Sequence, residues 1–272
     1  MAKKKKAMDY LDDEELEFLQ SKMAPKQKQA TTTLSSLFAS IKVKLKCKNQ
    51  KQKELHNLIT DKEIVFCQGA AGTGKSYVAA ATAIELLKNG PYSKIIICCP
   101  NVEASAMQIG LLPGSVDEKI QPFLDAIEFT IQKILSESGN MGSKEILNTL
   151  LKNEIIQEEA VSFLRGKTFD NSVIIIDEAE NLNKQETMLI LSRIGRNSKM
   201  VFLGDSQQID RKDIKKAKDK CGLDYAFDVL QDMEEVGFVQ FTEDDIVRNP
   251  IIGKILKRWN GMEDIQKDEN KI

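Results

Sequence analysis

GAAGTGKS, at residues 69–76, is the most informative segment of this chain. It satisfies the pattern GxxxxGK[ST] in full, between an apolar run, EIVFCQ (63–68), and a helix-forming run, YVAAATAIELL (77–87). Its glycines allow the backbone to wrap around phosphate oxygens, so that successive N–H groups point inward. The segment therefore predicts a phosphate-binding loop at the start of a helix. A glycine-rich turn before an ordinary helix is the less favoured alternative.

The residues of this loop have distinct expected roles, with ATP and Mg²⁺ as the predicted cofactors. Lys75 would reach the β- and γ-phosphates of ATP, and the hydroxyl of Ser76 would be a ligand of Mg²⁺. The predicted nucleotide-binding residues of the loop are Gly69, Ala70, Ala71, Gly72, Thr73, Gly74, Lys75, Ser76 and Tyr77.

A second motif, SVIIIDEAEN (172–181), ends an apolar run with two acids. Ligands of open α/β sheets bind at the carboxyl ends of strands. Asp177 is therefore expected to hold Mg²⁺, directly or through water, and Glu178 to orient and deprotonate the attacking water. Small-molecule P-loop kinases do not need this glutamate, so the acid pair favours hydrolysis. An acidic strand end exposed to solvent is the alternative, which the upstream phosphate loop makes less favoured.

A third apolar run, KMVFLGD (199–205), leads into SQQID, where Asp205 or Gln208 is expected near the γ-phosphate. Phosphoryl transfer also needs a cation opposite the developing negative charge. An arginine of a neighbouring subunit could supply that charge as well as one of the same chain. The spacing alone does not choose among four candidates, which are Arg165, Arg193, Arg196 and Arg248.

Four short apolar runs, EIVFCQG (63–69), KIIICCP (94–100), SVIIIDE (172–178) and KMVFLGD (199–205), alternate with helical patterns. Near-continuous apolar runs are typical of strands that are buried on both faces of a parallel sheet. The fold class predicted is α/β: a P-loop NTPase with a doubly wound, mostly parallel sheet flanked by helices. Those helices are expected at 76–89, 122–138, 143–163 and 184–194.

Residues 1–40 are expected to form an N-terminal extension and linker, with a short amphipathic helix over 8–22. In IKVKLKCK (41–48), apolar residues alternate with lysines, which predicts a strand with one lysine face. That face could follow a nucleic-acid backbone, but lysines also protect the edge of a sheet from aggregation, and we favour this second interpretation. The ATPase domain is expected over 41–260, and a polar tail over 261–272.

Composition restricts the function classes further. A net charge of −2 over 272 residues excludes a wholly basic nucleic-acid binder, although a local basic patch remains compatible with it. Five cysteines without a CxxC pair argue against a disulfide framework or a zinc site and favour a reducing compartment. His56 is the only histidine, which argues against catalytic triads. No run resembles a membrane span or signal peptide, so a cytoplasmic location is expected.

Six motifs, in this order, make the chain resemble the PhoH-like proteins, also called phosphate starvation-inducible ATPases, which are related to superfamily-one helicases. The resemblance covers about Asn49 to Trp259, or most of the chain. The motifs are GAAGTGKS (69–76), PNVEASAMQIGLLPG (100–114), FLRGKTF (163–169), IIIDEAEN (174–181), LSRIGRNSKMVFLGDSQQID (191–210) and DDIVRNPII (244–252).

The resemblance implies ATP binding and hydrolysis and allows coupling to RNA or single-stranded DNA. By position, Gln208 matches the γ-phosphate sensor, and Arg248 and Arg165 match the arginines of the VR[HN]P and RG[RK]T motifs. Gln50 matches a glutamine that reads adenine, with Gln52 as the alternative register. We expect a homo-oligomer, for which a hexameric ring is one form.

Three positions depart from the family pattern. Cys99 stands where an arginine usually precedes the proline, Glu180 replaces the glutamine of DEAQN, and Ser115 replaces an aspartate. The missing cation at Cys99 argues against strong binding of a nucleic-acid strand. The function expected is an Mg²⁺-dependent ATPase that remodels RNA or single-stranded DNA. The alternative is a nucleotide-gated assembly protein with slow turnover and no helicase activity, and a small-molecule kinase is the least favoured.

Overall fold

The computed structural model describes residues 37–100, 116–211, 214, 221–249, 251, 254–255 and 258. The predicted helix over 8–22, the motif residues 101–114, Ser115 and the tail over 261–272 lie outside these residues. The chain divides into two units, 1–41 and 42–272, and the sheet and the candidate site belong to the second unit. None of the helices in the described ranges combines the length and apolarity needed to cross a membrane.

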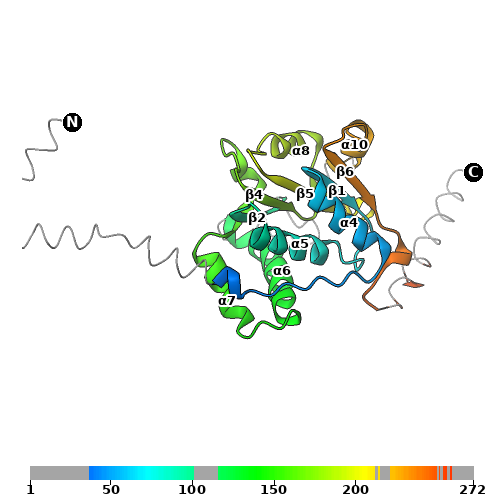
Figure 1. Ribbon diagram of the computed structural model, residues 1–272. Coiled ribbons are helices and arrows are strands. Elements are labelled where there is room, and N and C mark those ends of the chain that lie inside the picture. Colours follow the sequence, from blue (N-terminus) through cyan, green and yellow to red (C-terminus); the bar gives the residue numbers. More distant parts are fainter. Residues whose placement is uncertain are drawn as a thin grey trace, which may run out of the picture. The chain divides into compact units, whose positions relative to one another are not determined.

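Six strands form one sheet in which every pairing is parallel (Figure 1). The four predicted apolar runs are its four central strands, which confirms the predicted α/β fold. The apolar pattern does not indicate the two outer strands, IQEEA and VGFVQ, because polar residues or a glycine interrupt their apolar residues. The spatial order is β3 (Ile156–Ala160), β2 (Lys94–Cys99), β4 (Ser172–Ile176), β5 (Lys199–Gly204), β1 (Ile64–Gln68) and β6 (Val236–Gln240).

Helices cover both faces of the sheet, which explains why β4 and β5 are buried along their whole length (Figure 1). One face carries α4 (Gln50–Asp61), α5 (Lys75–Asn89) and α6 (Val116–Glu137), with α7 (Ser143–Lys152) packed on α6. The other face carries α8 (Lys184–Leu191) and α10 (Gly222–Val229). Under α10, the ring of Phe66 stacks between those of Phe202 and Phe238, at centroid distances of 4.6 and 5.5 Å.

One predicted helix is wrong in its second half. The helical pattern over 143–163 ends in the structure with α7 at Lys152, and the chain then enters β3 and a 3₁₀ turn, η2 (Val161–Leu164). The backbone of Glu154 is left-handed, at φ 55°, a conformation that commonly ends a helix. Ile156 then pairs with Ile95 of β2 and is buried, so pairing with a distant segment overrides the local helical pattern.

The strand predicted over 41–48 is also wrong, although its alternation is correct. Lys42, Lys44, Lys46 and Lys48 are exposed, while the apolar residues between them are partly buried. This segment is extended but pairs with no strand of the sheet. Instead, the N–H groups of Lys42 and Lys44 donate to Asn140 Oδ1 at 2.8 Å and to Ser138 Oγ at 2.9 Å. Side chains of the α6–α7 connection thus take the place of a neighbouring strand.

Candidate nucleotide-binding site

The predicted phosphate loop lies between the end of β1 at Gln68 and the start of α5 at Lys75. Its backbone is left-handed at Gly74, where φ is 88° and an added Cβ would lie 2.7 Å from Gln52 Nε2. Gly69 is equally constrained, because an added Cβ would lie 2.5 Å from Cβ of Phe241. Only glycine fits both positions, so the spacing of the motif follows from backbone conformation and close packing.

Lys75 lies across the loop that it terminates. Its ammonium group donates to the carbonyl of Gly69 and, at 3.1 Å, to that of Ala70. The Thr73 hydroxyl donates to the same Ala70 carbonyl at 2.9 Å. The loop is therefore held closed by the Lys75 ammonium group and the Thr73 hydroxyl, both bound to its own carbonyl oxygens.

The two halves of the predicted metal site meet directly. The Ser76 hydroxyl, at the start of α5, donates to Asp177 Oδ2, at the end of β4, at 2.9 Å. The pKa of Asp177 is raised to about 6, chiefly by burial and next by the neighbouring Glu178, while the hydrogen bond from Ser76 opposes both effects. A hydroxyl and a carboxylate are hard oxygen donors that suit Mg²⁺, so these residues fit the predicted ion.

Glu178 has an exposed side chain on a strained backbone. Its φ is 56°, in the left-handed region, and the 3₁₀ turn η3 (Ala179–Asn181) begins immediately after it. Such a conformation costs about 1–3 kcal/mol in a residue other than glycine and is found preferentially at functional sites. The next two polar residues, Glu180 and Asn181, are each only 1% exposed. The predicted catalytic acid is thus held by a turn that is itself buried.

The two residues expected near the γ-phosphate, Asp205 and Gln208, differ in their exposure to solvent. Both belong to the turn after β5, which contains η4 (Ser206–Gln208). Gln208 is exposed and donates from Nε2 to Asp205 Oδ2 at 2.6 Å. Asp205 is buried, and its other carboxylate oxygen accepts from the N–H of Gln207 at 3.1 Å. Because β5 lies between β1 and β4, this turn lies between the phosphate loop and the acid pair.

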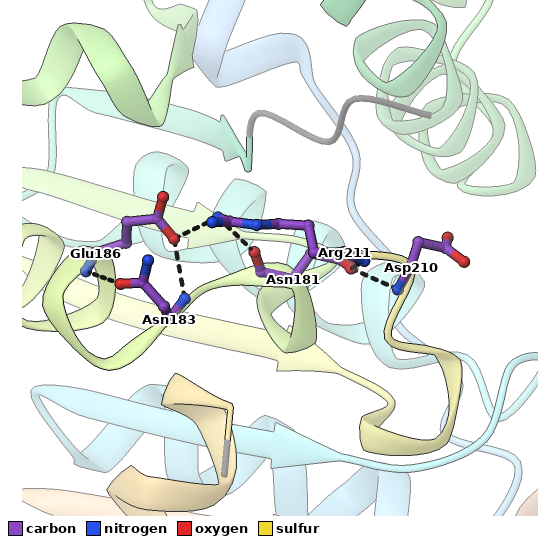
Figure 2. A network of polar contacts seen from close by, with 5 residues as sticks. All are labelled: Asn181, Asn183, Glu186, Asp210 and Arg211. Carbon is purple, nitrogen blue, oxygen red and sulfur yellow. Dashed lines mark hydrogen bonds and ion pairs between the residues drawn. The ribbon is translucent and has the colours of Figure 1, made fainter. Parts of the chain in front are cut away.

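A polar network joins the turn after β5 to the turn after β4 (Figure 2). Asn181 Oδ1 accepts from the N–H of Asp210 at 2.8 Å, and the Asn181 carbonyl accepts from Arg211 Nη1 at 3.2 Å. Arg211 also binds Glu186, at 2.5 Å, and Glu186 forms a capping box with Asn183 at the start of α8. These residues were not identified from the sequence. The Asn-x-x-Glu spacing of the capping box was the signal available.

Sheet topology distinguishes among the four arginines. Arg193 and Arg196 bind the segment that precedes β4, so they lie at the amino ends of the strands, opposite the phosphate loop. Arg165 follows η2 at the carboxyl end of the outer strand β3. Arg248 lies against the phosphate loop of its own chain: the N–H of Val247 donates to the Gly72 carbonyl at 3.0 Å. A Cβ added to Gly72 would lie 3.4 Å from Arg248 Cδ.

Gln52 supports the loop from behind. It is buried, its Nε2 donates to the Thr73 carbonyl at 2.8 Å, and its Oε1 accepts from the N–H of Lys48 at 2.7 Å. Gln50 is exposed at the first position of α4. The side-chain amide of Gln52 is thus occupied by backbone groups, which leaves Gln50 as the candidate for contact with a base.

The remaining loop residues take different positions. Ala71 is exposed at the tip of the loop. Tyr77 points toward α6, where its hydroxyl donates to Glu137 Oε2 at 2.8 Å. Burial and this neighbouring carboxylate raise the pKa of Tyr77 to about 12. Cys99, at the end of β2, is buried.

The chain is similar to known proteins over most of its length. The family model described as PhoH-like protein matches residues 44–260. The PhoH-like protein of Bacillus subtilis is 32% identical over 216 residues, covering 79% of this chain, and that of Synechocystis is 30% identical over 219 residues, covering 80%. Protein PhoH of Escherichia coli K12 is 30% identical over 216 residues, covering 78%. The chain spans 57–64% of the length of these relatives.

Among solved structures, the Pif1 helicase of Candida albicans aligns with 73% of this chain and 41% of its own. The TM-score is 0.35 at 15% identity, a likeness too distant to support an argument.

Proposed function

Since the chain belongs to the PhoH-like protein family, we propose that it is an Mg²⁺-dependent ATPase that couples hydrolysis to the remodelling of RNA or single-stranded DNA. The observation that carries the ATPase proposal is the 2.9 Å hydrogen bond between Ser76 and Asp177, from motifs about 100 residues apart. The first motif cradles phosphate and the second supplies carboxylates. Their meeting supports one site for a nucleotide and its metal ion.

Each residue of the site has a role in this proposal. Lys75 would exchange its carbonyl partners for the β- and γ-phosphates. Ser76 and Asp177 would hold Mg²⁺, which when bound neutralises charge on the phosphates. Glu178 would accept a proton from the attacking water, because its carboxyl is exposed beside the metal-binding pair.

The charge that develops in the transition state needs a further cation and a sensor. Arg248 is our choice for the cation because its side chain lies beside Gly72 in the same chain, and Arg165 is the second candidate. Gln208 is our choice for the sensor because its amide is exposed on the turn between the two motifs. Gln50 would contact adenine.

The nucleic-acid part of the proposal rests on the family and on the four exposed lysines over 42–48. We also propose a homo-oligomer, of which a hexameric ring is one form, in the reducing environment of the cytoplasm. The alternative function remains a nucleotide-gated assembly protein. Its support is the buried Cys99, where the family usually has a cation.

The proposal is tested by measuring phosphate release from ATP in the presence of Mg²⁺, with and without single-stranded RNA or DNA. The mass of the protein in solution is measured under the same conditions. We expect hydrolysis that the nucleic acid stimulates and that Lys75→Ala abolishes. Glu145→Gln, an exposed change on α7, is the matched control and should behave as the wild type. A wild-type protein without activity, or unchanged turnover in Lys75→Ala, would reject the ATPase. Slow turnover that nucleic acid leaves unchanged, with a mass that ATP changes, would favour the assembly protein.

A further inference from the structure

Glu180 is a buried glutamate, and carboxyl groups are seldom fully buried in proteins. It follows Glu178 by two residues in the sequence, yet it is only 1% exposed. Transfer of an ionised carboxylate into such surroundings is strongly unfavourable unless the group is hydrogen-bonded or neutral. The partners of Glu180 therefore show what it does in the folded protein.

The first partner is the backbone of the turn after β5. Glu180 Oε2 accepts from the N–H of Asp205 at 3.1 Å. This approach depends on Gly204, because a Cβ added there would lie 2.6 Å from Glu180 Oε2 and 2.7 Å from Leu223 Cδ2. The glycine at the end of β5 thus makes room for the Glu180 carboxyl beneath the turn that carries Gln208.

The second partner is the side chain of Glu178, which lies within hydrogen-bonding reach of Glu180. Two carboxyl groups in such contact need a proton between them. Burial, followed by the nearby Glu178, raises the pKa of Glu180, so the buried residue carries the proton. The groups acting on it are Glu178 and the backbone N–H groups of Glu180 and Asp205, while α10 contributes apolar Leu223.

Asn181 holds the other end of the same turn. Its Oδ1 accepts from the N–H groups of Asp210 at 2.8 Å and Arg211 at 3.3 Å (Figure 2). Two successive buried residues of η3 therefore bind both ends of the 205–210 turn. The turn that follows Glu178 and the turn that carries the exposed Gln208 are therefore joined by these hydrogen bonds.

We propose that Glu180 is a positioning residue whose buried carboxyl donates to the Glu178 carboxylate and accepts from the Asp205 N–H, so that the catalytic acid and the Gln208 turn are aligned together. A glutamine has the same length and can also donate and accept, so it would perform the same task. The inference rests on the proposed ATPase function for its kinetic consequences. The bridge itself can be tested without nucleotide.

The test compares Glu180→Gln, Glu180→Ala and Glu180→Asp, with Glu145→Gln as control. We expect Glu180→Ala to lower kcat about 100-fold, the effect of misplacing a catalytic group by about 1 Å, with the KM for ATP unchanged. Glu180→Asp keeps the acid but is one methylene too short, and should show the same loss. Glu180→Gln should recover kcat to within about threefold of the wild type. Deuterium uptake of the 204–210 peptide, without nucleotide, should increase in the alanine and aspartate variants only.

The outcomes separate this inference from the proposed function. If kcat in Glu180→Ala and Glu180→Asp equals that of the wild type, or if Glu180→Gln is as impaired as they are, the positioning role is rejected. Should Glu180→Ala not fold, the aspartate variant decides in the same way. A wild-type protein that hydrolyses no ATP rejects the proposed function. In that case, the deuterium uptake of the variants still decides whether Glu180 bridges the two turns.

Discussion

At the scale of single residues, the candidate site places strained and buried groups next to exposed ones. Glu178 presents its carboxyl to solvent from a left-handed backbone, and this strain persists only where the surroundings impose it. Those surroundings are Glu180 and Asn181, both buried and both bound to the turn after β5. The exposed residue would perform the chemistry, while the buried residues hold its position.

We predict that Glu178→Gln leaves ATP binding intact and slows hydrolysis between 10²- and 10⁴-fold, because the amide keeps the shape of the side chain but cannot accept a proton from water. Binding of a fluorescent ATP analogue and phosphate release measure the two effects separately. Lost binding with normal turnover of the residual complex would show that Glu178 has a structural role instead.

The buried Glu180 also predicts how stability depends on pH. Its pKa is raised in the folded protein above the ordinary value of 4.5, so the folded state holds a proton that the unfolded state releases. This contribution to stability is complete below pH 4.5 and is lost as the pH rises toward the folded pKa. Glu180→Gln removes the titration, so its stability relative to the wild type should increase by at least about 1 kcal/mol between pH 5 and pH 8. Urea unfolding without nucleotide measures this, and a constant difference would contradict it.

At the scale of elements, the lysine segment over 42–48 connects a charged surface to the phosphate loop. The N–H of Lys48 binds Gln52, and Gln52 binds the carbonyl of Thr73. The segment is not an edge strand, so protection of a sheet edge no longer explains its lysines. Its alternate residues repeat about every 7 Å, which is close to the phosphate repeat of an extended single strand.

Replacement of the four lysines by glutamine should therefore weaken single-strand binding and reduce its dependence on salt. Each phosphate contact removed should lower the slope of log affinity against log salt by about 0.7, so four contacts should lower it by nearly 3. ATP hydrolysis without nucleic acid should not change, because none of these side chains belongs to the candidate site. Affinities over a salt series, for RNA and for DNA, measure the slope. A slope equal to that of the parent protein would leave the segment without a binding role.

At the scale of the whole molecule, the position of Arg248 bears on assembly. The segment after β6 returns to the phosphate loop of the same chain, where Val247 binds the Gly72 carbonyl. A chain whose own Arg248 serves its own nucleotide does not require a neighbour for that charge. The expected homo-oligomer would then not form its catalytic sites between subunits through this residue.

Mixing two inactive variants tests this arrangement. We predict that Arg248→Ala mixed with Glu178→Gln stays as inactive as the separate proteins, because each chain lacks one part of its own site. ATP hydrolysis is measured after the mixture has been unfolded and refolded together, with solution mass as the control for mixed assembly. Activity well above the sum of the two variants would show that the arginine acts across a subunit boundary.

The local pattern of the chain determined the phosphate loop, the four central strands and the acid pair after β4. These features depend on backbone conformation and on the period of apolar residues, which neighbouring residues encode. The tertiary structure alone decided which arginine lies beside the loop, that Glu180 and Asn181 are buried, and that 42–48 pairs with side chains and not with a strand. It also decided that β3 replaces the end of a predicted helix. Each of these outcomes depends on contacts between segments far apart in the chain, and the free energy of such contacts overrides local preference.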